Sequence, residues 1–399
     1  MIVLAAFLLL CGMCSALFYV ILPLTRQVHT SAIETNVAFG ALAGIGIILG
    51  AALLWQGIGT LTGRGLVRSA RVFPHLLILV ILFFASLLLG LGALSIQNIV
   101  RGAQGVTITA FVFPPWHVIA ASIPPIAILA YTAHRLGATS GLRALLVSVS
   151  WGALGATALG IVIEVLIAIG FVVVAAVVIS LGSNSQELVQ QLQRQLALAR
   201  ATGDYSTITE WMNNPVVLAV VLLYAAVLIP FVEEALKTVV VAFIDPRRTR
   251  LADALLWGIG AGAGFALFEN LFNGSEALSI WALTIILRIG ATIMHVANGA
   301  TMGRGWYAAR VERRWSRLFI AYIVSVFFHA AWNAAALLLS SSVAFLLGNQ
   351  DTASQMTLPA AGLVAALAVV LLVLTSLGWA WIVYLVRSAQ TILQQGSAA

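Results

Sequence analysis

Residues 216–243 read VVLAVVLLYAAVLIPFVEEALKTVVVAF, and their only charged residues are Glu233, Glu234 and Lys237. As a helix, this run is long enough to cross the roughly 30 Å hydrocarbon core of a bilayer. An ionisable side chain at the centre of a membrane helix costs roughly 2.5–3.5 kcal/mol on insertion scales, so such residues usually face the bundle interior and serve function. The stretch therefore predicts a transmembrane helix that carries a polar site.

The rest of the chain has the composition of a membrane protein. Of its 399 residues, 62% are hydrophobic and 8% are charged, with a mean hydropathy of +1.07. Soluble domains carry roughly 25% charged residues. We predict an all-α, polytopic transmembrane helix bundle of about ten spans, with a four-helix core that holds the polar site. The predicted spans are residues 2–22, 37–57, 73–94, 117–136, 146–181, 216–243, 252–272, 279–303, 318–343 and 359–386.

The distribution of polar residues divides the chain into four parts. Residues 1–182 hold about five N-terminal spans, almost free of membrane-embedded charge. Residues 183–214 form a long polar insertion on the extracytoplasmic side, in which leucines at every fourth position predict an amphipathic helix on the membrane surface. Residues 215–345 hold about four spans with nearly all of the embedded charge, and residues 346–399 form the last span and a tail.

The arginines predict the orientation in the membrane. Fourteen of the nineteen follow even-numbered spans, so the positive-inside rule places both termini in the cytoplasm of a multi-pass cell-membrane protein. Because these charges cluster between apolar runs, the net charge of +7 does not indicate nucleic-acid binding. Residues 2–22 lack a preceding basic region, so we expect a retained helix and not a signal peptide.

Helical spacing places the embedded polar residues on defined faces. Lys237, the only lysine in the chain, lies one turn from both Glu233 and Glu234 and suits an ion pair that keeps one glutamate ionised. Similar spacings recur in the next three spans: Phe265 with Glu269, Arg288 with His295, and His329 with Asn333. Each of these four spans thus has one polar face, and four such faces can meet inside a helix bundle. Four glycines at two-residue intervals, Gly258, Gly260, Gly262 and Gly264, predict close helix packing.

Two histidines and a nearby carboxylate form a ligand set suited to Zn²⁺. Catalytic zinc sites usually use three protein ligands and a water, and the metal lowers the pKa of that water toward about 7. We expect His295 and His329 to bind the metal, with Glu233 or Glu234 as general base or ligand. Asn333 is a candidate donor to the oxyanion, a role worth roughly 2.7–4 kcal/mol where measured.

Glu269 is harder to place from the sequence. Counted from the helix ends, the other candidates come within about two turns of the membrane midplane, whereas Glu269 lies near the outer end of its span. Either Glu269 binds the metal from a short, displaced helix, or it contacts the metal-binding residues without binding the metal itself.

The sequence motifs that contain these polar residues resemble those of a known protein family. Glu233-Glu234-Ala-Leu-Lys237 resembles the EExxK motif of the PrsW family of intramembrane proteases, and Phe265-Ala-Leu-Phe-Glu269-Asn270 resembles its FxxxEN motif. Arg288 with His295 is similar to its third motif helix, and His329-Ala-Ala-Trp-Asn333 to its final HxxxN motif. The order and spacing agree over about residues 216–340.

This resemblance implies a zinc-dependent metalloendopeptidase whose partner is a single-pass membrane protein substrate, such as an anti-sigma factor. The acidic pair and the histidines would form the site, supported by Lys237, Arg288, Asn270 and Phe265. The family is similar to a wider superfamily of CAAX prenyl proteases and bacteriocin-immunity proteins. The prenyl proteases have a histidine where this chain has Glu269, so the role of that position does not carry over.

Two other functions fit the same residues. A proton- or ion-coupled transporter would relay protons through the glutamates and histidines, but such transporters commonly have two similar halves, which this sequence lacks. A non-catalytic membrane scaffold of the same superfamily would tolerate loss of the acids or histidines. The lipid bilayer is an expected partner, and the sequence does not predict the oligomeric state.

Overall fold

A computed structural model describes residues 1–25, 31–63, 72–136, 141–180, 215–274, 278–348 and 358–398, together with the single residues 190, 194 and 197. Every element assigned in these ranges is a helix, and ten helical stretches are long and apolar enough to cross a membrane. The predicted all-α fold with about ten spans is therefore confirmed. Apart from the three single residues, the predicted surface helix of the 183–214 insertion lies outside the described residues.

The chain divides into two compact units, which we describe separately. Unit 1 contains residues 1–157, 237–325 and 375–399, and unit 2 contains residues 158–236 and 326–374.

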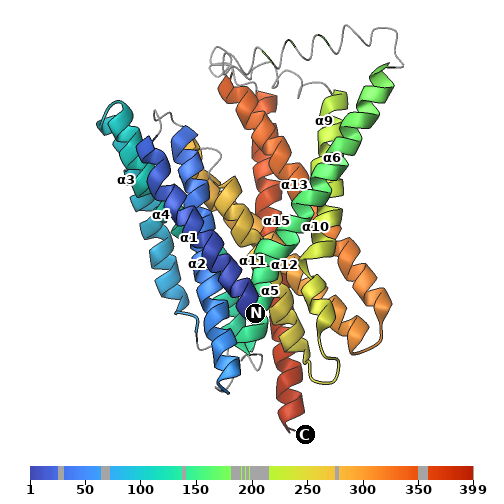
Figure 1. Ribbon diagram of the computed structural model, residues 1–399. Coiled ribbons are helices and arrows are strands. Elements are labelled where there is room, and N and C mark those ends of the chain that lie inside the picture. Colours follow the sequence, from blue (N-terminus) through green and yellow to red (C-terminus); the bar gives the residue numbers. More distant parts are fainter. Residues whose placement is uncertain are drawn as a thin grey trace. The chain divides into compact units, whose positions relative to one another are not determined.

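Unit 1 is built around helices α4, α11 and α12. Helix α1 packs on α2 and α3 packs on α4, while α4 also contacts α2, α11 and α12 (Figure 1). The elements that lie in unit 1, wholly or nearly so, are α1 (Ile2–Thr25), α2 (Ser31–Leu61), α3 (Leu76–Ile99), α4 (Ala103–Leu136), α5 (Leu142–Ser150), the π-helical η2 (Trp151–Ala156), the 3-10 helices η4 (Val239–Phe243) and η5 (Leu278–Ile280), α11 (Leu251–Asn273) and α12 (Trp281–Arg310).

Glycines bring α11 into backbone contact with its neighbours on two faces. A Cβ atom at Gly258 would lie 2.1 Å from the carbonyl oxygen of Gly299 in α12, and one at Gly262 would lie 2.3 Å from that of His295. On another face, a Cβ atom at Gly264 would lie 2.1 Å from the carbonyl oxygen of Val149 in α5. The predicted role of these glycines in close packing is confirmed, and α11 is the most deeply buried span of the described residues.

Unit 2 contains residues 216–236 of the apolar run that carries Glu233 and Glu234. Its elements are α6 (Thr157–Ser180, apart from its first residue), α9 (Pro215–Leu222), the π-helical η3 (Leu223–Leu228), α10 (Ile229–Lys237, apart from its last residue) and parts of α13 (Trp315–Gly348) and α15 (Leu358–Ala398).

The π-helical turn η3 leads into Pro230, and together they leave a carbonyl group to be satisfied. The backbone N–H of Ile229 bonds the carbonyl of Tyr224, five residues back. The next potential donor, the nitrogen of Pro230, carries no hydrogen, so the carbonyl of Ala225 has no partner within the helix. The side-chain amide of Asn333 in α13 donates to this carbonyl, with Nδ2 3.0 Å from the oxygen. The helix before Pro230 therefore contains a π turn, whose open carbonyl is bound by a side chain of α13.

Two predicted boundaries are clearly wrong, and one of them is the end of α15, which lies at Ala398 instead of residue 386. Helix α4 begins at Ala103 instead of residue 117, and contains Pro114 and Pro115 in addition to Pro124 and Pro125. Prolines remove backbone donors, but a membrane helix accommodates them where neighbouring helices and local adjustments satisfy the freed carbonyls.

Candidate functional site

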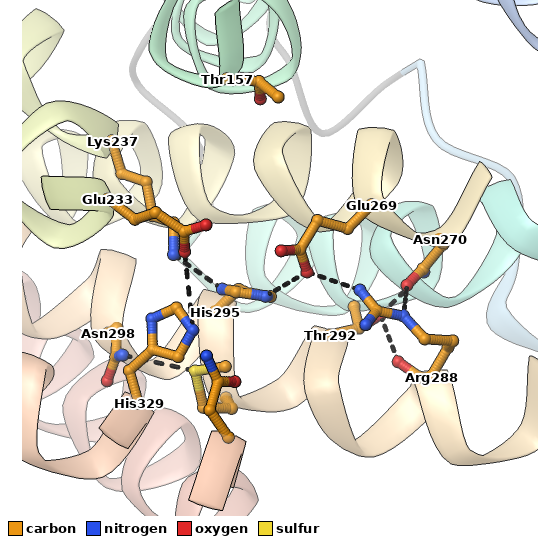
Figure 2. Close-up of polar contacts among 12 residues, drawn as sticks. Thr157, Glu233, Lys237, Glu269, Asn270, Arg288, Thr292, His295, Asn298 and His329 are labelled. Carbon is orange, nitrogen blue, oxygen red and sulfur yellow. Dashed lines mark hydrogen bonds and ion pairs between the residues drawn. The ribbon is translucent and has the colours of Figure 1, made fainter. Parts of the chain in front are cut away.

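In unit 1, the carboxylate of Glu269 joins α11 to α12. Its Oε2 atom accepts a hydrogen bond from Nη2 of Arg288 at 2.6 Å and another from Nε2 of His295 at 2.7 Å. Figure 2 shows Glu269 between these two partners. The Arg288 and Glu269 side chains are 17% and 18% exposed, so the ion pair is largely shielded from the surroundings.

The direction in which helical side chains lean explains how Glu269 reaches His295. The close approach of Gly262 to the His295 carbonyl sets the register of the two antiparallel helices. Glu269, seven residues after Gly262, is therefore level with Arg288, seven residues before His295. In an α-helix each Cα–Cβ bond tilts toward the N-terminus. Glu269 therefore leans toward the level of His295, and His295 leans toward the level of Glu269. The two side chains meet between the levels of their backbones.

The second nitrogen of His295 contacts Lys237. The Lys237 Nζ atom lies 2.8 Å from Nδ1 of His295 and 4.0 Å from the centroid of the Phe265 ring, a cation–π contact. An ammonium group can only donate, so Nδ1 is the acceptor and the ring proton is on Nε2, which donates to Glu269. His295 is thus a neutral imidazole with a defined tautomer.

Asn270 and Thr292 hold Arg288 in place. Oδ1 of Asn270 accepts from Nε of Arg288 at 2.8 Å, and Nδ2 of Asn270 donates to Oγ1 of Thr292 at 3.0 Å and to the carbonyl of Ala121 at 3.2 Å. Sequence reasoning missed Thr292. Its position one turn from both Arg288 and His295 was the available signal, but a lone threonine in a membrane helix carries little weight.

In unit 2, the imidazole of His329 lies between the two carboxylates of α10. Its Nδ1 atom is 2.8 Å from Oε1 of Glu234. Its Nε2 atom is 3.5 Å from Oε2 of Glu233, and Figure 2 shows this second contact. All three side chains are buried. Glu234 and Glu233 are adjacent on the helix, so they approach the ring from different sides.

The donors around His329 suit a metal ion. Two ligand atoms that share a tetrahedral zinc lie about 3.3 Å apart, given bond lengths of about 2.0–2.1 Å. The 2.8 Å between Nδ1 of His329 and Oε1 of Glu234 is a hydrogen-bond distance, and a small separation of these two atoms would let both bind one ion. Imidazole and carboxylate are also ligand types that zinc accepts.

The ten predicted site residues fall into these two clusters. Unit 2 holds Glu233, Glu234, His329 and Asn333, and unit 1 holds Lys237, Phe265, Glu269, Asn270, Arg288 and His295. Nine of them contact at least one other member of their cluster. Asn333, the predicted oxyanion donor, instead uses Nδ2 on the carbonyl of Ala225.

One comparison with known proteins found a family match. The family model described as "PrsW family intramembrane metalloprotease" matches residues 140–375. The match begins before and ends after the 216–340 range suggested by the motifs, and thus includes α5, α6 and the insertion. No curated protein and no solved structure matches the chain.

Proposed function

The chain belongs to the PrsW family of intramembrane metalloproteases, and from this premise we propose that it is a zinc-dependent endopeptidase that cleaves single-pass membrane proteins. The observation that carries the proposal is the buried contact between His329 and Glu234, an imidazole and a carboxylate on two motif helices. A buried ionisable pair in a membrane helix is costly, and such pairs usually serve function.

We assign Glu234, His295 and His329 as the metal ligands, because together they offer one carboxylate and two imidazoles, all buried. Helix α10 supports this grouping: it carries Glu234, which contacts His329, and Lys237, which contacts His295. Because Nε2 of His295 is used on Glu269, its Nδ1 atom is the ligand in this proposal, and Lys237 must release it.

This assignment gives Glu269 and Lys237 supporting roles. Glu269 orients the ring of His295 and raises its basicity, as carboxylates behind metal-binding histidines commonly do. Lys237 occupies the Nδ1 position with its own positive charge until the metal replaces it. Glu269 is thus not itself a ligand.

A bound metal ion would supply Lewis acidity toward the peptide carbonyl and would activate a water molecule. We assign Glu233 as the general base. The water oxygen forms a bond to the scissile carbonyl carbon while Glu233 accepts a proton. The carbon–nitrogen bond then breaks, and Glu233 returns the proton to the leaving amine. Net hydrolysis yields one carboxyl and one amine terminus.

The location of the site supports this substrate class. The site residues belong to helices that are apolar enough to span a membrane, so a substrate must bring its cleavage point into the bilayer. A single-pass membrane protein does so, and a regulator such as an anti-sigma factor fits this class. We place the enzyme in the cell membrane with both termini in the cytoplasm, as the arginine distribution predicts.

The test measures zinc content and substrate cleavage on the same purified samples. Wild type is compared with Glu234→Ala and His329→Ala, using a panel of single-pass fusion substrates in proteoliposomes. Both variants should lose zinc and cleavage. Glu34→Ala and His134→Ala are matched controls, because they remove an exposed glutamate and an exposed histidine. Unchanged cleavage in both site variants would refute the proposal, and a proton flux lost in the same variants would favour a transporter.

A further inference from the structure

Unit 1 also contains a cavity whose lining residues have no role in the proposed protease function. A cavity of about 390 Å³ lies among α12, α13 and α15. Its volume is within the range of roughly 300–1,000 Å³ that is typical of small-molecule sites. The residues around it are Thr301, Arg304, Gly305 and Ala308 of α12, Arg317, Ile320, Ala321 and Val324 of α13, and Trp381 of α15.

The lining residues occupy one face of each of the first two helices. In both α12 and α13 they recur at i, i+3, i+4 and i+7, the period of a single helix face. The two helices touch at one point of this face, because a Cβ atom at Gly305 would lie 2.8 Å from Cβ of Ala321. The indole N–H of Trp381 in α15 donates to Oγ1 of Thr301 at 2.8 Å, and this bond holds the Trp381 ring beside the cavity.

Two guanidinium groups give the cavity a positive charge. Arg304 has no carboxylate partner among the described residues. Arg317 shares Glu312 with Arg314, at 3.2 Å and 3.7 Å, and its side chain is 50% exposed. No acidic residue lines the cavity. The site is therefore suited to an anion.

The remaining wall is apolar and open to the surroundings of the bundle. Ile320 is 60% exposed, Val324 49% and Trp381 42%. These side chains belong to helices apolar enough to span a membrane, so lipid chains are their natural neighbours. The cavity lies toward the turn between α12 and α13, where the loop carries Arg313 and Arg314, and helix ends of this kind lie at the level of lipid headgroups.

We propose that this cavity binds an anionic phospholipid. The phosphate lies between Arg304 and Arg317, and an acyl chain runs along Ile320, Val324 and Trp381. The adjacent charge and apolar wall match the two parts of such a lipid, and basic pockets between membrane helices are a recognised way to bind anionic headgroups. A peptide would need backbone hydrogen-bond partners, whereas the polar groups of the cavity are chiefly the two guanidinium donors.

The test measures lipid retention by the purified full chain in native mass spectrometry. Phosphatidylglycerol and phosphatidylcholine with identical acyl chains are added separately, and inorganic phosphate is a third probe. We expect wild type to retain phosphatidylglycerol at least about tenfold more strongly, since each arginine near an anionic lipid contributes about 1 kcal/mol. The double variant Arg304→Gln/Arg317→Gln should lose this preference.

Two further variants change the charge outside the cavity and the space inside it. Arg247→Gln/Arg248→Gln removes the same charge from an exposed loop of unit 1 and should retain the lipid as wild type does. Val324→Trp fills the apolar part of the cavity without changing its charge and should also abolish retention. Equal retention of the two lipids by wild type, or equal loss in the loop variant, would overturn the proposal. The proposal would also be overturned if inorganic phosphate at the same concentration displaced the lipid, because the site would then bind an anion without recognising the acyl chain.

Discussion

The Nε2 atom of His295 donates to the Oε2 atom of Glu269 across the α11–α12 interface, at 2.7 Å. The same carboxylate oxygen accepts from Arg288 at 2.6 Å, so Glu269 is held from one side while it orients the imidazole on the other. The Nδ1 atom of His295 consequently faces Lys237, and its lone pair is directed away from Glu269. In the proposed site, this relationship makes Glu269 a carboxylate that positions a ligand.

Substituting Glu269 should weaken metal binding without abolishing it. Glu269→Ala removes the acceptor for Nε2 of His295, and loss of such a partner typically costs 10–100-fold in metal affinity or activity. Zinc affinity would be measured by competition with a chelator, with Glu34→Ala as the control that removes an exposed carboxylate. Complete loss of zinc, equal to that of His329→Ala, would indicate that Glu269 is a ligand.

The two adjacent glutamates of α10 should respond differently to amide substitution. Glu233→Gln removes a general base and should lower kcat by roughly 10²–10⁴-fold while zinc stays bound. Glu234→Gln replaces a ligand that contacts Nδ1 of His329 and should lose both zinc and cleavage. Zinc content and kcat of the two variants are compared on the same preparations. Zinc loss confined to Glu233→Gln would exchange the two roles.

Asn333 and Pro230 should be energetically coupled. Asn333→Ala leaves the carbonyl of Ala225 without its donor, and we expect a loss of about 1–2 kcal/mol in the free energy of unfolding. Pro230→Ala restores a backbone N–H that can bond this carbonyl. In the Pro230→Ala background, Asn333→Ala should therefore cost less, as a double-mutant cycle in a denaturing-detergent titration would measure.

The same cycle also tests the predicted oxyanion role of Asn333. If its amide acts mainly on the substrate, Asn333→Ala should lower kcat to the same extent with and without Pro230, and the unfolding free energy should change little.

The backbone contact between α11 and α12 should be intolerant of added volume. Gly262→Ala places a Cβ atom 2.3 Å from the carbonyl oxygen of His295, so one helix must move. We expect a destabilisation of about 1–3 kcal/mol and loss of zinc, because His295 moves with its backbone. Gly92→Ala in α3 is the matched control, since a Cβ atom there meets nothing within 4 Å. Wild-type zinc content in Gly262→Ala would disprove the role of this contact in placing His295.

Local patterns were sufficient for much of the site. The EExxK spacing placed Glu233, Glu234 and Lys237 on neighbouring positions of one helix, and they lie together at the end of α10. The one-turn spacing of Phe265 and Glu269 likewise put them on one face of α11, and both contact His295. These predictions needed only the helical period, which does not depend on the rest of the fold.

Depth estimates were less successful, as Glu269 illustrates. Counting residues from the helix ends separated Glu269 from His295, but the register is set by glycine contacts between backbones and the side chains lean toward each other. The partner of Asn333 was also beyond sequence reasoning, because a carbonyl such as that of Ala225 has no residue-type signature.

The amino-acid sequence alone determined that this protein is a bundle of about ten membrane-spanning helices with its ionisable residues on a few defined faces. Hydropathy and helical periodicity are local properties, and the absence of water in the bilayer leaves helices as the available structure for such runs. Only the tertiary structure decided which atoms meet: Nε2 of His295 with Glu269, Nδ1 with Lys237, and His329 with the acidic pair. Those pairings depend on helix register and side-chain direction, which arise when distant helices pack against one another.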